Sequence, residues 1–472
     1  MKFYITTPIY YVNDRPHAGH AYTTVAADVL ARWQKQKGRD IFFETGVDEH
    51  GAKIAEAAKK AGLEPRDFCD EKARDFQNAW KLLNIDYSAF IRTTDKNHEK
   101  SVQKTLEILN NKGFIYKSEY EGLYCVGCEQ YKSLDDLVDG KCLDHQKEPE
   151  KMKEESYFFK LSAFGDILKQ KIYSGEFKIE PEARRNEVLS FLESGLKDIS
   201  ISRKNVAWGV PLPFDKEHTV YVWVDAFLNY LTVLGWNPDD QSDNFKKFWP
   251  PDLQIMAKDI LRVHATIWPG ILLALDLPLP QRFFAHGFFT INGQKMSKSL
   301  GNVIWPEELV QKFGADASRY LLLSSTPFGQ DGDISWEKMM EKYNADLANG
   351  LGNLLSRVLN LIEKNFDGRI KAEKSDLEIS GFMENLQLFE ALQVIKEKIN
   401  WANKYIDETK IWELVKNDKP KAEKILAELL GAILKIGESL KPFMPETGRK
   451  IVETASVEKI KKGEILFPRI EN

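Results

Sequence analysis

Residues 2–33 read KFYITTPIYYVNDRPHAGHAYTTVAADVLARW, and this stretch decides the fold. Its first nine residues are rich in β-branched and aromatic side chains, which predicts a buried strand. Apolar residues then recur with helical period from Tyr22 to Trp33, and Gly38 marks the predicted end of that helix. DIFFETG, residues 40–46, predicts a second strand. A strand–helix–strand unit predicts a parallel α/β domain whose ligands bind at the carboxyl ends of the strands.

Two histidines, His17 and His20, lie where the first strand turns into its helix. At this spacing two imidazoles can share one face of a helical turn. Three uses are open. The histidines could form a metal pair completed by Asp48 and His50, a phosphate clamp, or two ordinary packing residues. The backbone N–H groups and positive dipole end of the helix start favour an anion, and Gly19 lets a ligand approach the backbone closely.

The overall composition is that of a globular protein with several domains. Of the 472 residues, 43% are hydrophobic and 29% are charged, and the formal net charge is -5. This charge excludes a basic protein that coats nucleic acid indiscriminately. We expect no membrane span, because no apolar run is long enough to cross a bilayer. We expect no signal peptide or transit peptide, because the amino terminus has the residue pattern of neither. Four cysteines do not make a disulfide scaffold in a chain of this length, so the cytoplasm is the expected location.

A cysteine and histidine cluster follows in the first half of the chain. Cys125 and Cys128 form one close pair, and Cys142 and His145 form a second pair after a gap of 13 residues. Two close ligand pairs joined by a short loop match a closed tetrahedral structural zinc site. The alternative is coincidence between buried thiols, which is how we interpret the remaining cysteine, Cys69.

The pattern along the chain predicts a split Rossmann-type parallel sheet with a zinc-bearing insertion, followed by an all-α helical bundle. The insertion is turn-rich and holds all but one of the cysteines, and the last part of the chain consists of long amphipathic helices. The predicted segments are a first catalytic half at 1–112, the insertion at 113–218, a second catalytic half at 219–285, a loop and linking region at 286–340, and a helical domain at 341–472.

A polar loop in the second half favours phosphate chemistry. INGQKMSKSLGN, residues 291–302, places Lys295 and Lys298 among small hydroxyl residues. Lysines in such a loop suit the transient charge of phosphoryl or nucleotidyl transfer, and a solvated basic loop is the alternative. The chain contains no Walker-type phosphate loop, so a nucleotide would be held in another way.

Together, HAGH near the start and KMSKS downstream resemble the two signature motifs of class I aminoacyl-tRNA synthetases. The resemblance is closest to the methionyl-tRNA synthetases and covers nearly the whole chain. It is carried by TTPIYYVNDRPHAGHAY, GVDEHG, the cysteine cluster, WGVPLP, VYVWVDAFLNY, AKDILRVHATIWP and HGFFTINGQKMSKSLGN. Ala18 departs from the pattern, because the family usually has a branched apolar residue there.

The resemblance implies a methionine–tRNA ligase that supports translation. Such an enzyme activates L-methionine with ATP and Mg²⁺ to methionyl-adenylate, releasing pyrophosphate. It then transfers methionine to the 3′ end of initiator and elongator tRNA(Met), releasing AMP. The implied cofactors are ATP with Mg²⁺, as substrate, and one structural Zn²⁺.

The resemblance also implies which residues do the work. His17, Gly19, His20 and Lys298 would bind ATP, and Lys295 would join His17, His20 and Lys298 in the catalytic group on closure of a mobile loop. Asp48 would pair with the methionine ammonium group. The implied side-chain pocket consists of Ile9, Tyr11, Trp223, Ala226, Tyr230, Asp259, Ile260, His264 and Trp268. We expect Tyr230 and His264 to offer polar hydrogens to the thioether sulfur.

In the helical region, Asn353 and Arg357 lie one turn apart, and Trp412 follows further on. In the resembling family these positions read the CAU anticodon by hydrogen bonding and stacking. The alternative is a helix cap, a surface arginine and a packed tryptophan. The expected partners are tRNA(Met), methionine and ATP, with no membrane. Some relatives add a dimerising domain after this region, so a chain that stops at Asn472 predicts a monomer.

Other functions remain as alternatives. A sister synthetase for another apolar amino acid often carries a large editing insertion, for which this chain has no room. A small-molecule adenylyltransferase shares a histidine–glycine–histidine motif but needs neither a zinc insertion nor a helical bundle. A zinc-bearing RNA-binding protein with a decayed catalytic core is the non-enzymatic alternative, and the intact lysines and histidines of both motifs argue against decay.

Overall fold

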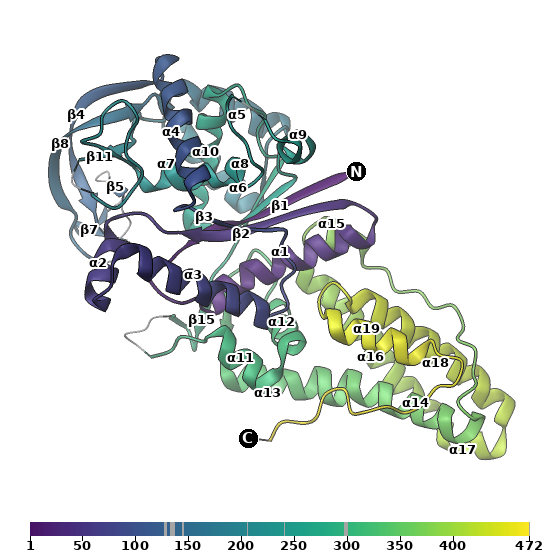
Figure 1. Ribbon diagram of the computed structural model, residues 1–472. Coiled ribbons are helices and arrows are strands. Elements are labelled where there is room, and N and C mark those ends of the chain that lie inside the picture. The colour runs from purple at the N-terminus through teal and green to yellow at the C-terminus, as the bar shows by residue number, and fades with distance from the viewer. Residues whose placement is uncertain are drawn as a thin grey trace.

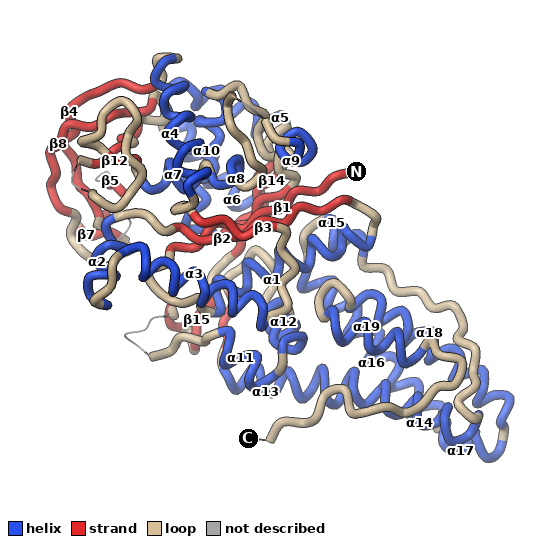
Figure 2. The backbone as a smooth tube through the Cα atoms, viewed as in Figure 1, coloured by secondary structure: helices blue, strands red, loops and turns tan. Residues whose placement is uncertain are grey.

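The computed structural model describes residues 1–126, 130–132, 137–143, 146–204, 206–239, 241–296 and 301–471. Figure 1 shows a region built around a sheet, which carries the N-terminus, and an elongated helical region that ends the chain. Figure 2 shows the strands gathered in the first region and long helices in the second. The predicted fold class, a Rossmann-like parallel sheet followed by a helical region, is confirmed.

A parallel sheet forms the centre of the first region. Within the described residues its six strands pair in the order β3–β2–β1–β13–β14–β9, and every neighbouring pair is parallel. Their bounds are β1 (Lys2–Tyr11), β2 (Asp40–Asp48), β3 (Ala89–Arg92), β9 (Lys178–Glu180), β13 (Leu253–Ala257) and β14 (Arg282–His286). The strand order reverses between β1 and β13, and ligands of such sheets bind outside the carboxyl ends of the strands at this point.

Side chains of each strand alternate between two hydrophobic cores, one on each face of the sheet. Ile5 and Ile255 face the core that contains α1, whereas Tyr4 and Met256 face the core that contains α4 and α10. The helices of this region are α1 (Ala18–Gln36), α2 (Ala52–Ala61), α3 (Pro65–Leu82), α4 (Lys96–Asn111), α5 (Gly165–Ser174), α6 (Glu182–Glu193), α7 (Val222–Phe227), α8 (Asn229–Thr232), α9 (Asp243–Phe248) and α10 (Leu261–Ala274).

The predicted insertion divides between two sheets. The strands β4 (Ile115–Cys125), β5 (Gln130–Lys132), β8 (Glu150–Phe159) and β10 (Ile199–Ser200) form an antiparallel sheet in the order β10–β8–β4–β5. Short pairs add β6 (Leu137–Val138) with β7 (Lys141–Cys142), and β11 (Ser202–Arg203) with β12 (Thr219–Val220). In contrast, β9 pairs with β14, so the predicted insertion contributes an edge strand to the central sheet.

A linking region and a helical bundle follow the central sheet. The linking region contains β15 (Phe289–Ile291), β16 (Gln294–Lys295), β17 (Gly332–Ile334), α11 (Pro306–Phe313), α12 (Ala315–Leu323) and α13 (Trp336–Lys342). A π-helical turn at Tyr343–Gly352 leads into the bundle of α14 (Asn353–Phe366), α15 (Ser380–Glu384), α16 (Leu388–Thr409), α17 (Ile411–Asn417), α18 (Lys419–Leu440) and α19 (Pro445–Ala455). Among the described residues, no helix is long and apolar enough to cross a membrane.

A buried arginine of the linking region connects the central sheet region to the bundle. Arg319 of α12 and Asp28 of α1 are both fully buried, and their side chains approach to 2.6 Å. The same guanidinium donates to the carbonyl oxygens of Pro442 and Phe443, between α18 and α19, and of Leu83 after α3. Helices from both regions therefore meet at one arginine.

Candidate active site

His17 and His20 lie at the switch point of the sheet, where β1 ends and α1 begins. His17 is the N-cap of α1, in extended backbone conformation. The Gly19 N–H donates to His17 Nδ1 at 3.0 Å, and the His17 N–H donates to His20 Nδ1 at 3.2 Å. The two rings stack with their centroids 3.9 Å apart. The local backbone thus fixes the orientation of both imidazoles.

These hydrogen bonds assign the proton positions of the two rings. A ring nitrogen that accepts a hydrogen bond carries no proton, so each neutral ring bears its proton on Nε2. Burial lowers the pKa of His17 to about 4. Burial, followed by the neighbouring His17, lowers the pKa of His20 well below its ordinary value. At neutral pH both histidines are therefore uncharged and present an Nε2–H donor.

We expected the helix start to offer unpaired backbone N–H groups to an anion, and for the first two residues of α1 this expectation is wrong. The Ala18 N–H donates to Ile304 O at 2.8 Å, and the Gly19 N–H already donates to His17. The first two N–H groups of α1 are thus used within the protein. Ala18 is fully buried, so its small side chain belongs to the packing of α1.

The structure brings Met296, the second residue of KMSKS, next to HAGH. A β-carbon at Gly19 would lie 3.7 Å from Met296 Cε and only 2.9 Å from the His17 ring, so glycine is required here. Arg15 lies over the ring of Trp305, with 3.9 Å between the guanidinium carbon and the centroid. Lys295 ends β16, and Lys298 lies outside the described residues.

The predicted methionine residues come from two sides of the carboxyl edge. On β1 and β2, Tyr11 and Asp48 are register partners, and Ile9 lies on the same face of β1 as Tyr11. On the other side, Trp223 and Ala226 belong to α7, and Tyr230, His264 and Trp268 belong to α8 and α10. Ile260 lies half-buried in the turn before α10, and Asp259 is exposed in the same turn.

A hydrogen-bond chain fixes the polar groups of this pocket. Tyr230 and His264 are each 2% exposed, and Tyr230 Oη lies 3.1 Å from His264 Nε2. His264 Nδ1 lies 2.8 Å from Ile260 O, which can only accept, so His264 carries its proton on Nδ1. Burial lowers the pKa of His264 to about 4, so the ring is neutral and Nε2 accepts from Tyr230. Our expectation that both residues offer hydrogens to sulfur is wrong for this arrangement, because both hydrogens are used within the protein.

Aromatic rings complete the wall around His264. The Trp223 ring lies 6.0 Å and the Phe227 ring 4.9 Å from the imidazole, both edge to face. Trp268 is fully buried, and its indole N–H donates to Gln254 at 3.1 Å. These rings form an apolar, polarizable surface suited to a thioether.

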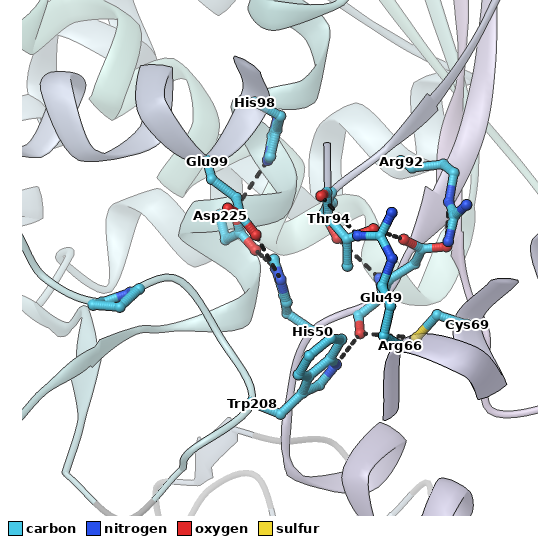
Figure 3. A network of polar contacts seen from close by, with 12 residues as sticks. Glu49, His50, Arg66, Cys69, Arg92, Thr94, His98, Glu99, Trp208 and Asp225 are labelled. Carbon is cyan, nitrogen blue, oxygen red and sulfur yellow. Dashed lines mark hydrogen bonds and ion pairs between the residues drawn. The ribbon is translucent and has the colours of Figure 1, made fainter. Parts of the chain in front are cut away.

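Sequence reasoning missed a buried cluster beside this wall, which Figure 3 shows. Asp225 of α7 lies between His50, which follows β2, and His98 of α4. His50 therefore pairs with the carboxylate of Asp225 and not with His17 and His20. Among the described residues, no group of three or more potential ligands could hold a metal ion. The metal use of His17 and His20 finds no support in this part of the chain.

The cysteine cluster is described in part. Cys125 ends β4 and Cys142 ends β7, with exposed fractions of 3% and 0%. Cys128 and His145 lie outside the described residues. Cys125 also lines a cavity of about 580 Å³ together with Asn13, two residues beyond β1. Cys125 thus lies near the carboxyl end of β1.

The three predicted anticodon residues belong to α14 and α17 of the bundle. Asn353 begins α14 and is exposed. Arg357, one turn on, pairs with Asp407 of α16 at 2.5 Å. Trp412 of α17 is 43% exposed, so it is not the packed tryptophan of the alternative interpretation.

Comparisons with known proteins agree with this site. The model of the family "tRNA synthetases class I (M)" matches residues 3–143 and 132–359. The methionine–tRNA ligase of Caldanaerobacter subterraneus subsp. tengcongensis is 44% identical, over 99% of this chain and 79% of that protein. The methionine–tRNA ligase of Thermotoga maritima is 43% identical, over 97% of this chain and 76% of that protein.

Solved structures agree as well. Mycobacterium tuberculosis methionyl-tRNA synthetase in complex with methionyl-adenylate superposes with a TM-score of 0.94 and 37% identity, covering 99% of this chain and all of that one. The free state of the same enzyme superposes with a TM-score of 0.86. With these likenesses and the geometry of its site, this chain belongs to the methionyl-tRNA synthetase family of class I aminoacyl-tRNA synthetases.

Proposed function

We propose that the chain is a methionine–tRNA ligase in which the two HAGH histidines act as uncharged hydrogen-bond donors to ATP. A methionine carboxylate oxygen attacks the α-phosphorus of ATP, the bond to the β-phosphate oxygen breaks, and pyrophosphate leaves. A ribose hydroxyl at the 3′ end of tRNA(Met) then attacks the carbonyl carbon of methionyl-adenylate, and AMP leaves. The carrying observation is the pair of Nε2–H groups fixed at the switch point beside Met296.

The roles of the individual residues follow from charge and position. His17 and His20, with Gly19 giving access, would donate to phosphate oxygens as negative charge develops, which is worth most in a site shielded from water. Lys295 and Lys298 would add positive charge from the loop. Asp48 would bind the ammonium group at the ends of β1 and β2. The pocket would hold the thioether between Ile9, Tyr11, Trp223, Ala226, Tyr230, Asp259, Ile260, His264 and Trp268.

The deciding test is ATP–pyrophosphate exchange stimulated by a panel of amino acids. We expect methionine to stimulate exchange, and leucine, isoleucine and valine to give far less at equal concentration. Stimulation by another amino acid would assign the chain to a sister synthetase. Absence of stimulation by any amino acid would contradict a synthetase function, including the adenylate step. A charging assay with tRNA(Met) then tests the second step.

A structural zinc ion is part of the proposal. Cys125, Cys128, Cys142 and His145 would hold it, which would fix the fold of the predicted insertion. Burial of Cys125 and Cys142 supports this donor set. We expect purified protein to carry about one zinc per chain and the Cys142→Ser variant to lose it. Cys69→Ser is the matched control, because Cys69 is buried in α3 and donates to Glu49 O at 3.5 Å. Equal zinc content in both variants would contradict the assignment.

The helical region at 341–472 would bind the anticodon of tRNA(Met) through Asn353, Arg357 and Trp412. The exposure of Asn353 and Trp412 supports this role. In this proposed division of labour, residues 1–112 and 219–285, together with β9 of the predicted insertion, would form the catalytic sheet, and residues 286–340 would link it to the bundle. The proposed function in translation favours a location in the cytoplasm.

A further inference from the structure

The segment Asp48–Gly51 connects the end of β2 to several other elements. The Glu49 side chain accepts from Nε of Arg92, the last residue of β3, at 2.8 Å and from the Thr94 hydroxyl just beyond it. The Glu49 carbonyl accepts from the indole N–H of Trp208 at 2.5 Å, and the Gly51 N–H donates to Trp208 O at 3.0 Å. Figure 3 shows these contacts converging from separate parts of the chain. Hydrogen bonds to the β3 region and to Trp208 therefore fix the residues that follow β2.

His50, in the same segment, is also held by a carboxylate that lies between two imidazoles. Asp225 Oδ2 lies 2.7 Å from His50 Nδ1, and Asp225 Oδ1 lies 3.0 Å from His98 Nε2. Asp225, His50 and His98 are between 1% and 4% exposed. Each carboxylate oxygen thus has its own partner, and neither imidazole can move without leaving a buried charge poorly paired.

These clustered residues are close in sequence to residues of the proposed methionine site. His50 follows Asp48, the proposed ammonium ligand, by two residues. Asp225 lies between Trp223 and Ala226 of the proposed side-chain wall. Helix α7 has six residues and is too short to be stable alone, so its position depends on contacts such as this one. The carboxylate therefore joins the two halves of the methionine site.

The carboxylates around His50 favour its protonated form. His50 faces Asp225 of α7 and Glu99 of α4, whose carboxylate lies 3.7 Å from Nε2; Glu49 is nearby, and the Trp208 ring packs edge to face at 5.6 Å. Burial alone would lower the pKa of His50, but the carboxylates of Asp225, Glu99 and Glu49 raise it. Burial would raise the pKa of Asp225, but the two imidazoles lower it to about 2.

We propose that Asp225 and His50 form a positioning pair for methionine, holding the Asp48-bearing end of β2 at a fixed distance from Trp223 on α7. The pair contacts no substrate atom in this role and acts through the two groups that it joins. This inference rests on the proposed function. Small displacements of substrate-binding groups cost large factors in affinity and rate, so the pair sets how well the ammonium contact and the aromatic wall form together.

The test measures the two substrate KM values separately in ATP–pyrophosphate exchange. For Asp225→Asn and His50→Gln we expect methionine KM to rise about tenfold, because a charged hydrogen bond is lost. We expect ATP KM and kcat to stay within about twofold, and the double variant to be no weaker than the weaker single variant. Glu99→Gln is the matched control. It removes a nearby charge without breaking the pair, and its methionine KM should stay within about twofold of the wild type.

Equal rises in methionine and ATP KM, or additive effects in the double variant, would overturn the proposal, because a general structural defect affects both substrates. Thermal unfolding shows which variants are folded, and His50→Gln retains an amide that can donate if Asp225→Asn does not fold. A wild-type protein without methionine-stimulated exchange would refute the proposed function itself. A wild type with exchange and variants with unchanged methionine KM would refute only the positioning pair.

A pH profile adds a readout that a merely structural role would not move. The pKa of His50 is raised in the folded protein, so the ion pair is present below that pKa and is lost as the pH rises through it. We expect the methionine KM of the wild type to rise across that transition. In Asp225→Asn the ion pair is absent at every pH, so methionine KM should be high throughout and show no such rise. Identical profiles for the two proteins would overturn the proposal.

Discussion

The catalytic region and the helical bundle present their proposed ligand groups in opposite ways. Around the sheet, His17, His20 and His264 are already hydrogen-bonded within the protein before any substrate arrives. On the bundle, Asn353 and Trp412 are exposed at the surface. Small substrates are enclosed, so their ligands are preorganised and dry, whereas bases of an RNA loop can stack on groups that remain in water until binding. Changes in the two regions should therefore have separable effects.

The junction between the regions should show the largest effect. Arg319→Ala removes one of the two guanidinium groups that pair with the buried Asp28, leaving Arg32 at 2.7 Å, and it removes the donors to three carbonyl groups. We expect the free energy of unfolding to fall by about 3–5 kcal/mol, chiefly because the three carbonyl groups lose their donors, measured by urea denaturation. Arg357→Ala is the matched control, because its pair with Asp407 is partly exposed and should cost no more than about 1 kcal/mol.

If Arg319→Ala does not fold, Arg319→Met keeps the apolar stem and serves in its place. Its circular dichroism on heating reports whether the sheet region and the bundle unfold in one transition or two. Two separate transitions would support a coupling role for Arg319. A loss of less than about 1 kcal/mol in a single transition would contradict it.

His20→Ala tests the preorganised groups of the catalytic region. It removes one preorganised donor, and we expect kcat for methionine-dependent exchange to fall about 10²–10³-fold. tRNA charging should fall by the same factor, because both assays need the adenylate. His218→Gln is the control, since His218 is also buried but lies in the insertion region, 3.1 Å from Ser202. An equal loss in the control would mean that burial of a histidine, rather than its place at the switch point, determines activity.

Trp412→Ala tests the bundle side. Stacking of a base on an aromatic ring contributes about 1–3 kcal/mol, so we expect the efficiency of tRNA charging to fall about 5- to 150-fold. Methionine-dependent exchange should be unchanged. Trp401 of α16, 36% exposed and stacked on Tyr405, is the matched control and should leave charging intact when changed to alanine. Loss of exchange in Trp412→Ala would show that the tryptophan is structural.

The sequence predicts the local features of this molecule well because their signals are local. The strand β1, the helix α1 and the paired histidines follow from periodicity and spacing within residues 2–33. The pairing of β9 with β14 depends on contacts about a hundred residues apart, and a three-residue strand carries no periodic signal. Asp225 and His50 are separated by 175 residues, so no spacing could join them. The proton positions of His17 and His264 depend on individual backbone groups, which only coordinates supply.

Tyr230→Phe should have the smallest effect and distinguishes two uses of one hydroxyl. Removing the hydroxyl leaves His264 Nε2 buried without its donor, which costs about 1 kcal/mol, so methionine KM should rise about fivefold. Norleucine, with a methylene in place of sulfur, provides the comparison. Because the hydroxyl is used on His264, we expect KM for methionine and for norleucine to rise by the same factor in the exchange assay. If only methionine KM rises, the hydroxyl turns to the sulfur when substrate binds, and the pocket is then less preorganised than the free structure indicates.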